Sequence, residues 1–123
     1  MPSETPKFNE VQSIRDVLRP GDSAVVLMTR GAVLKLNEDG TGSTGNWRAS
    51  PGPHVNRVIL YVKMGRTRSP AQLWRADYTG ATNASEPGRV VIHFRNAELV
   101  AATRALWTEF AGGGQSAIRY VDA

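Results

Sequence analysis

The chain has no cysteine and only two histidines among its 123 residues. The lack of cysteine excludes disulfides, thiolate zinc sites and thiol catalysis. No acidic cluster at ligand spacing accompanies His54 or His93, so we expect no metal site. No G-x-S-x-G or H-E-x-x-H motif is present either, and general acid–base chemistry needs its groups placed together. We therefore expect a protein that is not an enzyme and that needs no cofactor.

Long hydrophobic runs are also lacking. No segment approaches the roughly 18 consecutive apolar residues that cross a bilayer. The polar start, MPSETPKFNEVQ, does not resemble a signal peptide, and we expect a cytoplasmic protein. Hydrophobic residues make up 41% and charged residues 21% of the chain, which are ordinary globular values. We expect residues 1–123 to form a single domain.

The middle third of the chain lacks negative charge. Residues 1–39 hold five basic and six acidic side chains, residues 77–123 hold four and five, and residues 40–76 hold six and none. The six are Arg48, Arg57, Lys63, Arg66, Arg68 and Arg75. A patch of one sign attracts polyanions, and arginine binds phosphate through two hydrogen bonds. This indicates an anionic partner; a solvated basic face without a partner is the alternative.

The hydrophobic pattern predicts a β-rich α+β domain. Runs of β-branched and aromatic residues predict about six short strands, at 23–29, 32–38, 56–64, 71–80, 89–103 and 115–121. We expect the first two to pair as a hairpin and the fifth to bend near Asn96. Short helices are predicted over about 9–18 and 104–110. Short strands at close spacing favour a small β-barrel, closed or strongly curved.

Residues 40–54 read GTGSTGNWRASPGPH and contain G-x-G-x-x-G, the spacing of a dinucleotide-binding loop. That fingerprint needs a helix to begin at its last glycine, and Pro51 and Pro53 exclude one here. It is not a P-loop, because Asn46 stands where that motif has lysine. We instead expect a mobile, non-helical loop at the mouth of a cleft, with glycines that adopt positive φ.

Trp47 and Arg48 are the main candidate ligand contacts in this loop. Together they offer a stacking surface and a phosphate-binding group, and Asn46 and His54 lie beside them in the sequence. We expect Trp47 to be partly exposed. The alternative is that Trp47 packs into the core as a plug or lid.

Two further segments carry candidate contacts. Trp74 and Arg75 repeat the Trp-Arg pair on a predicted strand, where alternation directs one side chain inward and the other outward. The turn at 65–70 carries Arg66 and Arg68, which can straddle a phosphate backbone. The alternatives are a core position for Trp74 and a solvated turn without a ligand.

The order of these segments resembles the PUA-like superfamily, which includes the EVE and ASCH domains. The matching features are the Pro-Gly-Asp turn at 20–22, the apolar strand at 24–28 that follows it, and a later strand, 74–80, that ends near a glycine. The resemblance implies a small pseudobarrel flanked by helices, with a cleft that holds RNA or a modified base.

An aromatic pocket for a flipped base, as in EVE-like domains, would draw on Trp47, Arg48 and Trp74. The sequence therefore favours a non-catalytic domain that binds DNA or RNA, with a modified base as one form of ligand. Two alternatives stay open. One is a binder of a small or cyclic nucleotide in a phage defence or anti-defence setting, and the other is a protein-interaction module.

Overall fold

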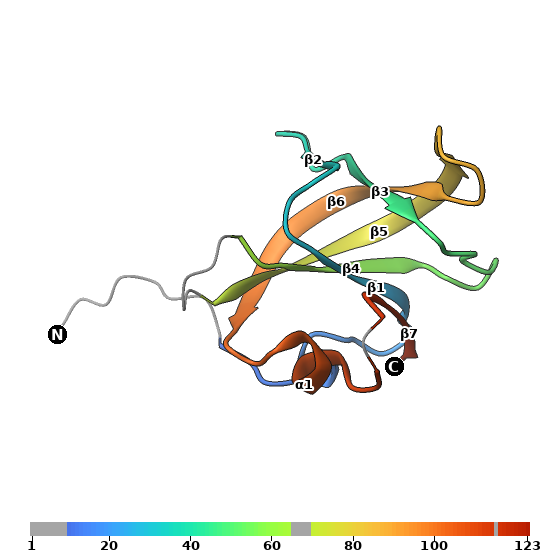
Figure 1. The fold of residues 1–123 in the computed structure, drawn as a ribbon. Coiled ribbons are helices and arrows are strands. Elements are labelled where there is room, and N and C mark those ends of the chain that lie inside the picture. The colour runs from blue at the N-terminus through green and yellow to red at the C-terminus, as the bar shows by residue number, and fades with distance from the viewer. Residues whose placement is uncertain (1–9, 65–69, 115) are drawn as a thin grey trace, which may run out of the picture.

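The protein is built around one mixed sheet of seven strands, ordered β2-β3-β6-β5-β4-β1-β7 (Figure 1). The computed structural model describes residues 10–64, 70–114 and 116–123, and the predicted basic turn with Arg66 and Arg68 lies outside these ranges. The strands are β1 (Ser23–Thr29), β2 (Leu34–Leu36), β3 (Gly42–Trp47), β4 (Arg57–Val62), β5 (Ala71–Asn83), β6 (Val90–Thr103) and β7 (Ile118–Asp122). A 3-10 turn, η1 (Ile14–Asp16), and a short helix, α1 (Trp107–Ala111), complete the fold.

The sheet is open, so the prediction of a closed barrel was wrong. Within the described ranges β2 and β7 end the strand order and do not pair with each other. The predicted hairpin between the first two strands was also wrong, because both edges of β1 are occupied. β4 pairs with one edge in parallel and β7 with the other in antiparallel, and β2 pairs with β3 instead. The β-rich α+β class, with two short helical elements, is confirmed.

The strands β1 and β4 are buried on both faces, which explains their continuous apolar sequences. Alternate residues of each strand contact one of two separate cores. Val26 and Ile59 belong to a cluster that includes residues of η1 and α1. Val25 and Leu60 belong to a second cluster, together with Phe94 of β6. The sheet therefore has an apolar core on each side of its centre.

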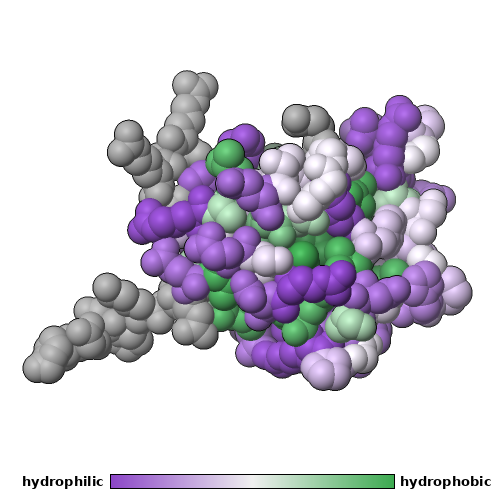
Figure 2. All heavy atoms as spheres, turned by 90° about the horizontal axis from the view of Figure 1, so that it is seen from below, coloured by the Kyte–Doolittle hydropathy of each residue, from purple (hydrophilic) through white to green (hydrophobic). Residues whose placement is uncertain are grey.

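The first core is covered by the helical elements, which lie below the sheet in Figure 1. Tyr61 of β4 meets Trp107 edge-on, with 5.4 Å between ring centres, and Phe110 at 5.5 Å. Trp107 is thus a buried residue of the first core. Seen from below in Figure 2, hydrophobic residues show in the middle of this face with hydrophilic residues around them.

The helical elements are shorter than predicted. The helix expected over about 9–18 is reduced to η1. A capping box sets its start at Ser13, with the Asp16 carboxylate accepting the N–H groups of Gln12 and Ser13 at 3.2 and 3.1 Å. The helix expected at 104–110 begins only at Trp107. Neither element is long enough to define a layer, so each serves as a cover for the first core.

Residues 42–47 form strand β3, so the prediction of a continuous loop over 40–54 was wrong. A Cβ on Gly42 would lie 2.2 Å from the carbonyl oxygen of Lys35 and 2.7 Å from the Phe94 ring. The glycine is needed there for close approach between strands. Positive φ occurs at Gly40 (86°), in the turn before β3. The remainder of the segment, 48–54, is irregular and non-helical, as predicted.

The two longest strands, β5 and β6, are neighbours in the sheet and extend beyond the strands beside them (Figure 1). The predicted bend near Asn96 is confirmed: this residue has φ 56°, and the register of the β5–β6 pair shifts beside it. Asparagine adopts this conformation at lower cost than most residues. The bend helps the outer strands curve around the second core.

Candidate functional site

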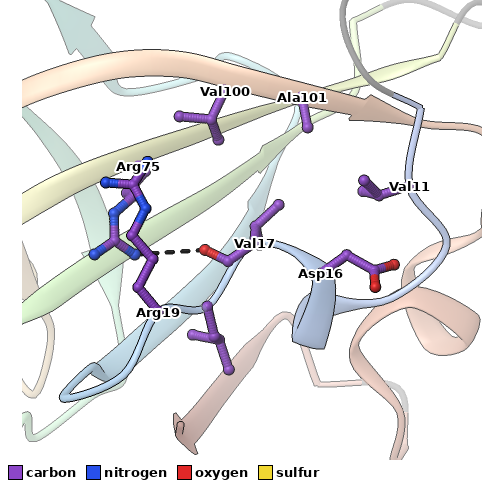
Figure 3. A pocket seen from close by; sticks show the side chains of 8 residues that line it. Val11, Asp16, Val17, Arg19, Arg75, Val100 and Ala101 are labelled. Carbon is purple, nitrogen blue, oxygen red and sulfur yellow. Dashed lines mark hydrogen bonds between the residues drawn. The ribbon is translucent and has the colours of Figure 1, made fainter.

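Arg75, a candidate ligand contact from the sequence, lies inside the protein. Its Nη2 donates to Asp22 Oδ1 at 2.8 Å, and its Nη1 donates to Asp22 Oδ2. The same Nη1 lies 3.4 Å from the Val17 carbonyl oxygen, at one end of a cavity of about 190 Å³ (Figure 3). The arginine is 6% exposed and the aspartate 4%. Arg75 therefore serves the fold rather than an exposed phosphate-binding surface.

Asp22 is the centre of a buried charge network. Burial opposes its charged form, but the hydrogen bonds from Arg75 and the Arg19 N–H, with the charges of Arg75 and Arg57, lower the pKa of Asp22 below its ordinary value. Arg57 Nε lies 3.2 Å from Asp22, and its Nη1 lies 2.9 Å from Asp77. Two arginines of the acid-free middle third thus meet aspartates of the flanking thirds.

The predicted basic face is therefore smaller than the sequence suggested. Arg57 and Arg75 are engaged in ion pairs, and Arg66 and Arg68 lie outside the described residues. Lys63 is half-buried at the end of β4, where its N–H donates to the Thr29 carbonyl. Arg48 is exposed, and no carboxylate of the described residues lies within 4.0 Å of it.

Trp47 ends strand β3 and is half-buried, so the predicted partial exposure is confirmed. Its ring packs against the second core, and its Nε1 donates to Thr44 Oγ1 at 3.1 Å. Trp74 on β5 packs against the same core, on the opposite face of the sheet from Leu73 and Arg75. Both tryptophans thus pack against the second core, and only part of the Trp47 surface is open to a ligand.

Arg48 and Tyr120 line an open hollow of about 370 Å³, together with Ala49, Ser50 and Gly88. The Ser50 N–H donates to the Tyr120 hydroxyl at 3.2 Å, which ties the segment after β3 to β7. Tyr120 remains 50% exposed. The hollow thus combines an exposed guanidinium with a half-exposed aromatic ring, and Trp47 precedes it directly in the chain.

Asn46 and His54, the other two candidates, do not line this hollow. The Asn46 side chain donates to Glu86 at 3.2 Å, and its carbonyl accepts from Arg89 at 3.1 Å. Arg89 also forms an ion pair with Glu86 at 3.4 Å. His54 is exposed in a turn before β4.

Tyr120 was not among the residues predicted to contact a ligand. It is separated from Arg48 by more than half of the chain, and only the folding of β7 onto β1 brings the two together. Burial, and then the neighbouring Tyr120, raise the pKa of Tyr78, which packs against the second core with Trp47.

No group of three or more potential metal ligands occurs in the described ranges 10–64, 70–114 and 116–123. Among the same residues, no helix has the length and apolar character to cross a membrane. Comparison with protein-family models, curated protein sequences and solved structures returned no match.

Proposed function

We propose that this chain is a non-catalytic nucleic-acid-binding domain with a PUA-like architecture. The observation that carries the proposal is the hollow that exposed Arg48 and half-exposed Tyr120 line together. Trp47 directly precedes Arg48 in the chain. Arginine holds phosphate through charge-assisted hydrogen bonds. Aromatic rings stack on any base, and this pairing is typical of proteins that bind single strands.

Each aromatic or basic side chain at the hollow would contact a different part of the nucleic acid. Arg48 binds a backbone phosphate, and the ring of Tyr120 stacks on a base. The open part of the Trp47 ring offers a second stacking surface, while the rest of the ring packs on the core. The hollow of about 370 Å³ falls within the roughly 300 to 1,000 Å³ of ligand pockets in proteins, so it has room for one flipped or modified base.

The PUA-like architecture is supported by features of the fold. The Pro-Gly-Asp turn precedes β1, and Asp22 of that turn is tied into the core by Arg75. A curved mixed sheet with short helical elements on one face suits an open pseudobarrel better than a closed barrel.

A binder of a small or cyclic nucleotide is the second candidate. The size of the hollow favours it, because one nucleotide would occupy this volume with its phosphate on Arg48. The two candidates differ in what they bind tightly: a strand contacts several sites along its backbone, whereas a single nucleotide contacts the hollow alone.

Arg48→Ala tests the proposal. Loss of this contact should remove about 0.5–1.5 kcal/mol of binding free energy. That is about a 2- to 12-fold loss of affinity at 1.4 kcal/mol per decade. Fluorescence anisotropy with labelled single-stranded DNA and RNA measures it.

Arg30→Ala is the matched control, because Arg30 is also exposed and lies near Tyr61, under the sheet. Both variants remove one positive charge. Equal affinity losses in the two would mean that only net charge matters and would remove the case for the hollow.

A further inference from the structure

A second hollow, of about 400 Å³, lies on the sheet near the turn between β2 and β3, and its lining residues come from four strands and that turn. Lys35 of β2, Ser43 of β3, Thr79 of β5, and His93 and Arg95 of β6 contribute polar side chains to it. None of these residues was selected from the sequence, because they come from separate segments between 35 and 95. The register of the sheet brings them together.

The strand register places these groups on one face. Lys35 pairs with Ser43, and Ser43 pairs with His93. Directly paired residues project from the same side of a sheet, so the three side chains form a row across β2, β3 and β6. Arg95 follows His93 by two residues and projects from that same side. Phe94, between them, is buried in the second core on the opposite side.

The residues that line this hollow carry positive charge. No aspartate or glutamate lines it. Asp77 of β5 is the strand partner of Arg95, but its carboxylate pairs with Arg57 at 2.9 Å and accepts from the Asn96 side chain at 2.8 Å. Within the described part of the chain, neither Lys35 nor Arg95 has a carboxylate within 4.0 Å, and both are exposed. The nearby Asp39 is occupied within its own turn, where its carboxylate accepts the Thr41 N–H at 3.0 Å and the Thr41 hydroxyl at 2.6 Å.

Neutral donors complete the hollow. The Ser43 hydroxyl and the Thr79 hydroxyl line it, and the His93 ring is held by Thr82, whose Oγ1 lies 2.8 Å from Nε2. Gly42 lies among these residues, where it lets β3 approach the Phe94 ring closely. Two cations with hydroxyl and imidazole donors on one concave surface match the chemistry of a phosphate group.

We propose that this hollow, defined by Lys35, Ser43, His93 and Arg95, is a phosphate-binding site. The inference deepens the proposed function and rests on it for the nature of the ligand, a backbone phosphate of a bound strand. Strand β3 connects the two hollows: Ser43 lies in this one, and Arg48, five residues later, lies in the other.

The first test is the double variant Lys35→Ala with Arg95→Ala, compared with Arg30→Ala and Arg104→Ala. The control removes the same charge, and its two residues lie near Tyr61 and just before α1. Anisotropy with a labelled single strand of about 12 nucleotides is measured between about 50 and 200 mM salt. The site variant should bind about 10- to 100-fold more weakly at 50 mM salt. Its slope of log affinity against log salt should be shallower by about 1.4, from two lost contacts.

The second test separates the two possible sources of phosphate. NMR titration of the full chain with inorganic phosphate and with a mononucleotide should shift the amide signals of Lys35, Ser43, His93 and Arg95. If the strand binds and the site variant matches the control, the inference is overturned and the proposed function stands. If no strand binds but phosphate shifts these four signals, the proposed function is overturned and the phosphate site stands. If neither the strand nor phosphate acts on these residues, the inference is overturned.

Discussion

Replacing Asp22 with asparagine is expected to lower the free energy of unfolding by about 3–5 kcal/mol, the usual cost of leaving one partner of a buried ion pair unpaired. The Asp22 side chain is 2% exposed, and Arg75, its partner, is 7% exposed. The substitution keeps the shape but removes the charge that compensates Arg75. For a domain of this length, the melting temperature should fall by about 10–20 °C.

Asp77→Asn is the matched control. Asp77 also pairs with an arginine, Arg57, but its side chain is 36% exposed. An exposed pair contributes only about 0–1 kcal/mol. Similar melting temperatures for the two variants would contradict the assignment of Asp22 to a structural network.

The pH dependence of the Asp22 variant follows from the same network. The pKa of Asp22 is lowered in the folded state, so its contribution is complete above the unfolded value of about 3.9 and is lost as pH falls through the folded pKa. The stability difference between the wild-type chain and Asp22→Asn should therefore be constant near neutral pH and narrow below about pH 4. Chemical denaturation at several pH values measures it, and a difference that persists unchanged into strong acid would argue against this linkage.

Trp47→Ala is expected to weaken binding of a single strand by about 5- to 150-fold, because a stacked base contributes about 1–3 kcal/mol. The ring is half-buried against the second core, so the variant should also lose stability, by less than the roughly 3–5 kcal/mol of a fully buried tryptophan. Affinity per folded molecule is measured by anisotropy, well below the melting temperature.

Trp74→Ala separates the two roles. Trp74 is also half-buried against the second core, but it lies on β5, whereas Trp47 directly precedes Arg48 of the hollow in the chain. We expect a comparable loss of stability with unchanged affinity. If Trp47→Ala and Trp74→Ala behave alike in both measurements, Trp47 is a packing residue and the base stacks elsewhere.

The parts of the fold that could be predicted are those where sequence and burial agree. The apolar runs at 23–29 and 56–64 became β1 and β4, because strands buried on both faces need such residues. Alternation along 71–78 places Leu73 in the first core and Trp74 and Tyr78 against the second. Here local pattern and tertiary environment indicate the same structure.

The strand β3 could not be predicted, because its sequence, GSTGNW, has little intrinsic preference for strand. Its structure comes from its partner β6 and from the close approach that Gly42 allows. The basic residues of the middle third led to the wrong expectation of a large basic face for a similar reason, because partners distant in the sequence determine their environment. Its arginines at 57 and 75 meet Asp22, which precedes them by more than thirty residues.

The most direct test of the account is the affinity of the wild-type chain for a labelled single strand of about 12 nucleotides, as DNA and as RNA, between about 50 and 200 mM salt. The account predicts binding whose log affinity falls linearly with log salt, by about 0.7 for each phosphate contact. No binding of either strand at the lowest salt, together with tight binding of a single or cyclic nucleotide, would contradict the strand-binding function and leave the small-ligand alternative.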